Sequence, residues 1–191
     1  MVKNTEQDTS APNLSCKDLQ QAVKEARIDP GAFGDLYRLS VERVYRYLYS
    51  RTGNTADAED LTAQTFLSAF EALPGLRQND RFVSWLFSIA RNKLKDYYRR
   101  RKPQTTLDAA ESAVEDHNPL AAVIRSEQNA RLDELIGSLP EQEQELLRLR
   151  FLAEMRFSEM GRLLHRSGDT VKKQVYRLLS RLQEQMEVSH E

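Results

Sequence analysis

Apolar residues recur at intervals of three and four along most of this chain, a spacing that predicts amphipathic helices rather than strands. The clearest case is residues 57–102, where a short polar loop separates two such helices. The first is expected to begin after Asn54, a candidate N-cap, and to end at Pro74-Gly75. Asp80 is the candidate N-cap of the second helix. That helix has one apolar stripe, which we expect to face a core: Phe82, Trp85, Leu86, Ile89 and Leu94, with Tyr97 near its end.

Two more helices are expected before this pair, over about 15–27 and 32–51. Ser15 followed three residues later by Asp18 matches a capping box, and Asp29-Pro30-Gly31 marks the turn between the helices. The four helices form a predicted first domain over 14–102, after a polar tail over 1–13 that we expect to be disordered. Most aromatic residues of this domain are expected in its core, namely Phe33, Tyr37, Tyr45, Phe66, Phe70, Phe82, Trp85 and Phe87.

The composition then changes. Residues 103–119 carry acidic side chains, no lysine or arginine, and a proline at each end. They predict an acidic, flexible linker, which we place over 103–127. After it the helical pattern returns and predicts a second domain over 128–187, whose first helix ends near Gly137.

Further helix starts follow in this second domain. Ser138 followed by Glu141 matches another capping box, and a short helix capped by Ser158 comes after it. The last helix is expected to run from Asp169 to about Met186. The helix after Ser138 carries the apolar residues Leu146, Leu147, Leu149 and Phe151. The expected buried stripe of the last helix is Val171, Val175, Leu178, Leu179, Leu182 and Met186. The sequence therefore predicts an all-α fold of two small helical domains joined by a flexible linker.

Charge adds a first functional expectation. The formal net charge is −1, so a surface for nucleic acid must come from local segregation of charge. The helix after Asp80 shows such segregation on the side opposite its apolar stripe: Arg91, Lys93, Lys95, Arg99, Arg100, Arg101 and Lys102, against Asp96 alone. With Tyr97 and Tyr98 as stacking surfaces, this helix has the groups that hold an unpaired strand. A solvated surface helix whose tyrosines belong to the core explains the same residues equally well.

Several other classes find little support. The single cysteine, Cys16, and three scattered histidines form no zinc pattern, and no phosphate-binding glycine loop or nucleophile–base pair is present. We therefore expect no enzyme, no metal and no cofactor. No apolar run is long enough for a membrane span and the first residues lack a signal core, so we expect a cytoplasmic protein.

The end of the chain predicts a second nucleic-acid surface. A short helix, a turn over 165–168 and a longer helix with basic outer positions form the layout of a helix-turn-helix. Val171 and Val175 would face the core, which leaves Lys172, Lys173, Tyr176 and Arg177 for bases and phosphates, and Arg150 and Arg162 for the DNA backbone. The alternative is a plain helical bundle with a basic surface helix, which the short helix and tight turn disfavour.

One surface thus suits an unstacked strand and the other suits a duplex major groove. A protein that needs both opens DNA beside a duplex anchor. The main alternative is a helix-turn-helix regulator of another class, in which the first domain senses or dimerises and the chain binds palindromic duplex as a two-fold dimer.

Three segments together resemble one family, the extracytoplasmic-function sigma factors of bacterial RNA polymerase. DAEDLTAQTFLSAF resembles the family's segment that docks on the beta-prime clamp helices, and FVSWLFSIARNKLKDYYRR resembles its helix for the −10 element. The stretch LPEQEQELLRLRFLAEMRFSEMGRLLHRSGDTVKKQVYRLLSRL resembles its −35-binding domain. The resemblance covers about 32–102 and 128–186 in the family's order.

The resemblance implies a role for each matching position. Polymerase docking falls to Asp57, Glu59, Asp60, Gln64 and Phe66. Recognition of the −10 element falls to Gln78, Asn79, Asp80 and Arg81, in the loop that pockets a flipped base in the family, and to Asn92, Lys95, Tyr98 and Arg99. Recognition of the −35 element falls to Arg150, Thr170, Lys172, Lys173, Tyr176 and Arg177.

The implied partners are bacterial core RNA polymerase, through the beta-prime clamp helices and beta, promoter DNA and an anti-sigma factor. The chain departs from the family at Ala63-Gln64, where Gln-Glu is common, and at His165 and Asp169, where glycine is usual. His165 is therefore expected to hold a positive φ, which is uncommon for a residue with a side chain. Asp169 suits a helix N-terminus but repels a nearby phosphate.

Overall fold

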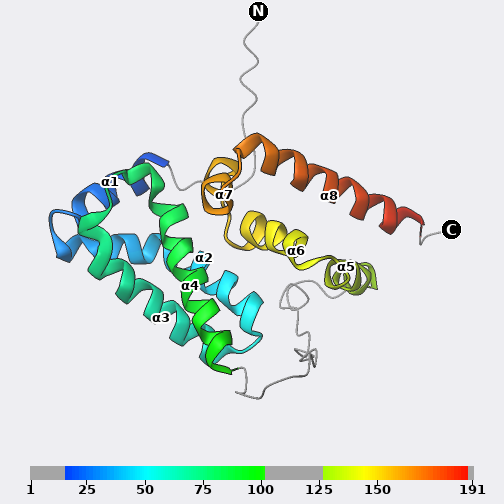
Figure 1. The fold of residues 1–191 in the computed structure, drawn as a ribbon, viewed down its shortest axis with the longest axis horizontal. Helices are drawn as coiled ribbons and strands as arrows, with labels where there is room; N and C mark the ends of the chain where they lie inside the picture. The colour runs from blue at the N-terminus through cyan, green and yellow to red at the C-terminus, as the bar shows by residue number, and fades with distance from the viewer. Residues whose placement is uncertain (1–15, 102–126, 189–191) are drawn as a thin grey trace, which may run out of the picture.

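The computed structural model describes residues 16–101 and 127–188, and the regular elements in both ranges are helical (Figure 1). The α-helices are α1 (Cys16–Ala26), α2 (Phe33–Thr52), α3 (Thr55–Ala72), α4 (Phe82–Arg101), α5 (Glu127–Gly137), α6 (Glu141–Leu147), α7 (Phe157–Leu164) and α8 (Gly168–Val188). Short helical turns lie between them: η1 (Pro30–Ala32), η2 (Leu73–Gly75), η3 (Asn79–Arg81) and the π-helical η5 (Arg148–Leu152). The prediction of an all-α fold is confirmed.

Helices α1 to α4 form the first bundle. Gly53 and Asn54 alone link α2 to α3, and Gly53 ends α2 with a left-handed φ of 63°. Asn54 then caps α3, its side-chain oxygen accepting a hydrogen bond from the Asp57 amide at 3.0 Å, as the sequence predicts. The buried residues at the centre of this bundle include Leu36, Leu48, Leu61, Phe82 and Phe87.

Helices α5 to α8 form the second bundle. Leu135, Leu139 and Leu147 pack against Leu178 and Leu182, which gives α5, α6 and α8 a small apolar cluster of their own. None of the helices in 16–101 and 127–188 is both long and apolar enough to cross a bilayer.

The two bundles pack directly against each other, a contact that the sequence analysis did not anticipate. α4 contacts α7 and α2 contacts η5, as the ribbon shows where the green and orange helices meet (Figure 1). Apolar residues of η5 and α7, among them Leu149 and Met160, belong to the same buried cluster as the core of the first bundle. One continuous core therefore extends from the first bundle into the adjoining part of the second, beside the separate cluster of α5, α6 and α8.

Three predicted caps are wrong. Asp80 lies inside η3, two residues before α4 begins at Phe82, and does not cap that helix. Ser138 donates its hydroxyl back to the Leu135 carbonyl at 2.8 Å and so finishes α5, while Pro140 precedes α6 without a side-chain cap. Ser158 lies inside α7, which begins at Phe157; there the Glu159 carboxylate accepts from the Arg156 amide at 2.8 Å.

Two aromatic residues expected in the core are exposed instead. Tyr37 and Phe70 leave large parts of their rings in solvent, as does Phe151 in the second bundle. Phe66, Phe82 and Phe87 are buried as predicted, and Phe33, Tyr45 and Trp85 are half-buried. The apolar spacing identified the helices, but an amphipathic pattern does not distinguish a residue facing the core from one at the edge of its stripe.

Several predictions fall outside the described residues. They are the tail over 1–13, the Ser15 end of the first capping box, and the linker over 103–127 except for its last residue, Glu127.

Candidate nucleic-acid interfaces

The turn between α7 and α8 depends on a left-handed residue that is not glycine. His165 ends α7 with φ 55° and ψ 43°, as expected from its place in the turn. The Arg166 amide then donates to the Gly161 carbonyl at 2.8 Å, which closes the end of the helix. The chain is thereby redirected within three residues, and α8 begins at Gly168.

Gly161 allows α7 to approach this turn closely. A Cβ atom at this position would lie 2.7 Å from the Arg166 carbonyl oxygen and 2.9 Å from the Gly168 nitrogen, distances that backbone atoms do not tolerate. On the other side of the turn, the Ser167 hydroxyl accepts a hydrogen bond from the Thr170 amide at 3.1 Å and caps α8. The angle between α7 and α8 follows from these local contacts.

The start of α8 has a buried side and a polar side. Val171 and Val175 are almost completely buried, as the sequence predicts. The opposite side exposes the predicted duplex-reading residues, namely Thr170, Lys172, Lys173, Tyr176 and Arg177. The Tyr176 ring is 53% exposed, and the Lys172 ammonium lies 5.9 Å from its centre. This surface is cationic with one aromatic ring, and it stands on a rigid helix.

Arg150 lies beside this surface, but its guanidinium group contacts other residues of the same bundle. Its guanidinium donates to the Met155 carbonyl at 3.0 Å and stacks over the Phe157 ring at 4.5 Å. Phe157 in turn lies 6.0 Å from Tyr176. Arg150 therefore supports the segment that leads into α7, next to the predicted reading face.

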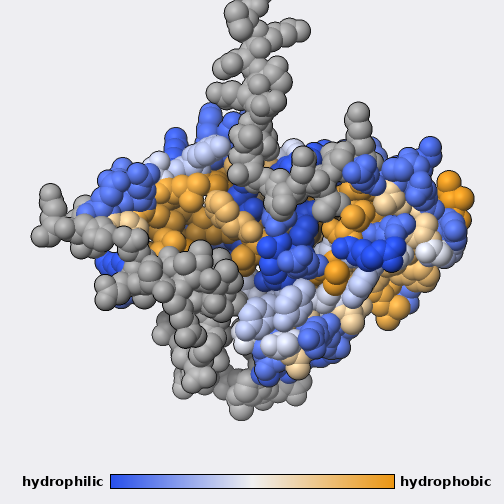
Figure 2. Space-filling view, turned by 180° about the vertical axis from the view of Figure 1, so that it is seen from behind, coloured by the Kyte–Doolittle hydropathy of each residue, from blue (hydrophilic) through white to orange (hydrophobic). Residues whose placement is uncertain are grey.

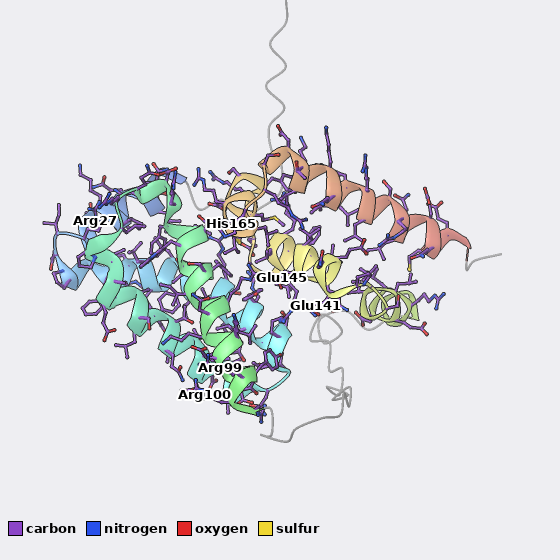
Figure 3. All side chains as sticks on the ribbon, in the orientation of Figure 1. Arg27, Arg99, Arg100, Glu141, Glu145 and His165 are labelled. Atoms are coloured by element: carbon purple, nitrogen blue, oxygen red, sulfur yellow. The ribbon has the colours of Figure 1, made fainter. Side chains whose placement is uncertain are left out.

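The second candidate surface is the exposed side of α4. Asn92, Lys95 and Arg99 are exposed there, and Arg99 and Arg100 extend from the last turn of the helix into solvent (Figure 3). Two acids pair with arginines at this end of α4: Asp96 lies 3.1 Å from Arg99, and Asp57 lies 3.2 Å from Arg101.

The two tyrosines of α4 are half-buried against the bundle. The Tyr97 hydroxyl donates to the Asp57 carboxylate at 2.8 Å, and the Tyr98 hydroxyl donates to the Arg51 carbonyl. Their rings meet edge to face at 5.3 Å, and both pack against the core. Burial, strengthened by the hydrogen bond to Asp57, raises the pKa of Tyr97 to about 12. Of the two interpretations left open by the sequence, these contacts favour core tyrosines over stacking platforms.

Arginine side chains from two other segments of the chain contact the loop before α4, residues 78–81. Arg27, directly after α1, donates to the Asn79 side-chain oxygen at 3.1 Å. Arg162 of α7 donates to the Asp80 carbonyl at 2.7 Å and pairs with its carboxylate at 3.1 Å. Gln78 and Arg81 remain exposed.

The predicted docking residues on α3 do not all lie on its surface. Glu59 and Asp60 are exposed, and the Gln64 amide donates to Asp60 at 2.6 Å. Asp57 binds Tyr97 and also pairs with Arg101 at 3.2 Å. Phe66 is only 4% exposed and packs in the core, where its side chain offers nothing to a partner.

Sequence reasoning missed the apolar part of this surface. Leu67 is 60% exposed and Phe70 43% exposed, on the same side of α3 as Asp60. The space-filling view shows hydrophobic surface at its lower right edge, on the α3 side of the first bundle (Figure 2). The spacing of Asp60, Leu67 and Phe70 by seven and three residues was the available signal, since it places them along one helix face.

Comparison with known families agrees with this arrangement. The family model described as Sigma-70 region 2 matches residues 36–104, which include α3, the 78–81 loop and α4. The model described as Sigma-70, region 4 matches residues 129–182, which include η5, α7 and the cationic face of α8. The two matches together cover more than half of the chain.

Individual relatives point the same way. The ECF RNA polymerase sigma factor BldN of Streptomyces coelicolor is 34% identical over 169 residues, which cover 86% of this chain and 64% of BldN. The ECF RNA polymerase sigma factor SigW of Bacillus subtilis is 27% identical over 180 residues, which cover 88% of this chain and 96% of SigW. The chain thus spans just under two thirds of the length of BldN and nearly all of SigW.

A solved structure supports the fold. CnrH, determined in complex with the cytosolic domain of CnrY, matches with a TM-score of 0.62 at 23% identity, over 89% of this chain and 97% of CnrH. The family of this chain follows from the two family matches, in their order along the chain, and from the relatives. The chain belongs to the sigma-70 family, in its extracytoplasmic-function group of RNA polymerase sigma factors.

Proposed function

We propose that this protein directs bacterial core RNA polymerase to particular promoters, by binding the −35 element as duplex and the −10 element as opened strand. The observation that carries the proposal is the α8 surface. Its cations and Tyr176 stand over an almost fully buried valine pair, so the helix can enter a major groove without disturbing its bundle. The chain contributes binding energy and no covalent chemistry.

For the −35 element we assign base and phosphate contacts to the exposed α8 residues, which are Thr170, Lys172, Lys173, Tyr176 and Arg177. Arg150 acts by holding the preceding segment through Met155 and Phe157. The α8 N-terminus also carries Asp169, whose charge disfavours a phosphate at that end and moves the contact towards Lys172 and Lys173.

For the −10 element we assign the 78–81 loop as the reader, with Asn92, Lys95 and Arg99 along the opened strand. Tyr98 supports this surface from beneath through its bond to the Arg51 carbonyl. Asn79 and Asp80 accept hydrogen bonds from Arg27 and Arg162, so these acceptors exchange an arginine for a base when the loop binds the strand.

Polymerase docking is assigned to the outer face of α3. Its acids, Glu59 and Asp60, flank the apolar pair Leu67 and Phe70, a combination suited to a basic, partly apolar helix on the partner. In the family this partner is the beta-prime clamp helices, and a second contact is made with beta. Phe66 and Asp57 hold α3 in place and do not contact the partner.

We further propose that the protein works in the cytoplasm beside the polymerase and is held inactive by an anti-sigma protein. The complex of CnrH with the cytosolic domain of CnrY supports this proposal, since a chain of the same fold there binds a protein partner.

Run-off transcription with core polymerase over a genomic promoter pool tests the proposal. Adding the chain should create start sites that are absent without it. A chain carrying Lys172→Ala, Lys173→Ala and Arg177→Ala should lose those starts while still co-purifying with core polymerase. If the start sites are identical with and without the chain, the proposed function is wrong.

A further inference from the structure

The first turn of α8 carries an acid that has no partner in the fold. Asp169 is the second residue of α8, close to the end that joins α7 (Figure 1), and its side chain is exposed. Among the residues that the structure describes, its carboxylate has no hydrogen-bond or ion-pair partner. Lys172 and Lys173 follow at the spacings that favour an ion pair on a helix, and Lys172 lies over the Tyr176 ring instead.

The N-terminus of α8 is already capped by another residue. The Ser167 hydroxyl oxygen accepts from the Thr170 amide at 3.1 Å and lies 2.8 Å from the Thr170 hydroxyl. The Ser167 carbonyl accepts from the Val171 amide at 3.1 Å. Ser167 is therefore the N-cap, and Asp169 adds to the helix only a negative charge near its positive end. The Asp169 carboxylate is free to accept a hydrogen bond from a ligand.

Asp169 lies on the face of α8 that we assign to duplex DNA. Lys172, Lys173 and Tyr176 follow it by three, four and seven residues, so the four side chains lie along one side of the helix. All four are exposed. In a helix-turn-helix, residues at the N-terminal end of the second helix contact the base edges. The position of Asp169 is therefore that of a base reader.

The chemistry of a carboxylate selects one base. An ionised carboxylate only accepts hydrogen bonds, and it repels other acceptors. In the major groove guanine presents two acceptors, thymine presents an acceptor beside its methyl group, and adenine presents an amino group beside the acceptor N7. Cytosine alone presents an amino group, on N4, with no acceptor on the same base. An acid that reads this groove therefore favours cytosine.

We propose that Asp169 is a specificity-determining residue, whose carboxylate accepts a hydrogen bond from the N4 amino group of a cytosine in the −35 element. This inference rests on the proposed promoter function and names the base chemistry that one end of the duplex-binding face requires. Lys173 is about 6 Å further along the helix axis, at 1.5 Å per residue. That distance is less than two base-pair steps of about 3.4 Å, so the cytosine preference falls on one base pair beside the phosphates bound by the lysines.

The test measures base preference with the full chain assembled on core polymerase. A promoter that depends on the wild-type chain is taken from the run-off experiment, and its −35 segment is randomised. Each sequence carries a transcribed barcode, so that transcripts are counted for every base at every position.

Two variants change the acceptor and one serves as a control. Asp169→Ala removes it. Asp169→Asn replaces it with an amide, which can donate to N7 and accept from N6 of adenine. Glu184→Gln is the matched control, because Glu184 is also an exposed acid of α8 but lies roughly 22 Å further along the axis. Circular dichroism should show the same unfolding temperature for all four chains, since Ser167 still caps α8.

We expect the wild-type chain to prefer cytosine about tenfold at one position of the −35 segment, the usual cost of one mismatched base pair. Asp169→Ala should lose this preference, Asp169→Asn should move it to adenine, and Glu184→Gln should keep it. Preferences at the other positions should stay as in wild type.

Three outcomes would overturn the inference. In the first, Asp169→Ala keeps the wild-type preference at every position. In the second, it raises transcription from all sequences equally, because the acid then acts only by repelling phosphate. In the third, the preference that it loses is for a base other than cytosine. Each of these leaves the promoter function intact, since the starts still depend on the chain, whereas an absence of chain-dependent starts rejects the promoter function itself.

Discussion

Two residues show how narrowly the helix-turn-helix is specified. His165 holds a positive φ where glycine is usual in the family, and Gly161 has no room for a side chain. The first was expected from the sequence, since the resemblance marked the position. The second required the three-dimensional path of the turn, because the atoms that would clash belong to residues 166 and 168.

Gly161→Ala should destabilise the second bundle by about 1–3 kcal/mol, since the new methyl group meets backbone rather than a movable side chain. Gly34→Ala is the control. Its nearest neighbour would be the end of the Arg38 side chain at 3.7 Å, so this change should be neutral or stabilising by at most about 1 kcal/mol. Urea unfolding followed by circular dichroism measures both. Equal stabilities for the two variants would contradict the close approach.

The raised pKa of Tyr97 predicts that the folded chain loses stability at alkaline pH. Its pKa is raised from 10.0 to about 12 in the folded chain, so the folded state binds this proton more tightly than the unfolded state. The corresponding stability is present below pH 10 and is lost as the pH rises towards about 12. Tyr97→Phe should flatten this decline in a series of urea unfolding curves, whereas Tyr176→Phe, on the exposed face of α8, should follow wild type. An unchanged slope for Tyr97→Phe would exclude it as the group responsible.

The helices α8 and α3 each have one face that we propose binds a partner, and the two faces differ in their chemistry. On α8 the outward groups are cations above buried valines, and the sequence periodicity alone assigned them correctly to the surface. On α3 the outward groups include Leu67 and Phe70, which the same periodicity placed with the core or left unassigned. An apolar residue is ambiguous in sequence because cores and interfaces both select it.

For α8, the triple variant Lys172→Ala, Lys173→Ala and Arg177→Ala should weaken binding to promoter duplex at every salt concentration. The slope of log affinity against log salt should fall by about 0.9 for each phosphate contact removed. Arg181→Ala, further along the same helix and paired with Glu143, is the control. A triple variant that keeps the wild-type salt slope would remove α8 from the duplex interface.

For α3, Leu67→Ala with Phe70→Ala should impair assembly with core polymerase while leaving the fold intact, because both side chains already face solvent. Loss of such central apolar contacts typically weakens an interface by about 2 kcal/mol or more. Ile28→Ala, an exposed apolar residue outside α3, is the control. Size-exclusion co-elution with core polymerase measures assembly. If the double variant co-elutes as wild type does, docking uses another surface.

The continuous core across the two bundles has a consequence for unfolding. Leu182 packs with α5 and α6, far along α8 from the bundle contact, whereas the single tryptophan, Trp85, lies in α4. If the bundles unfold as one unit, a cavity at one end must lower the stability reported at the other.

Leu182→Ala should therefore shift the denaturation midpoint seen by Trp85 fluorescence, by an amount corresponding to about 2–5 kcal/mol. The shift should coincide with that of the total helix signal in circular dichroism. Combining Leu182→Ala with Glu145→Gln should separate the two signals, since Glu145 of α6 pairs with Arg91 of the first bundle and the bundles are then less tightly coupled. If Leu182→Ala alone leaves the denaturation midpoint of Trp85 fluorescence unchanged, the two bundles unfold independently.

The sequence by itself determined the helices, their order, the cap at Asn54 and the basic outer face of α8. These features arise from contacts within a few residues, which repeat with the helical period and so appear in the linear pattern. Only the tertiary structure decided that Phe66 is buried while Phe70 is exposed, and that Arg43 reaches a carbonyl 110 residues away. Such contacts depend on how separate helices meet in space, and no spacing along the chain records that.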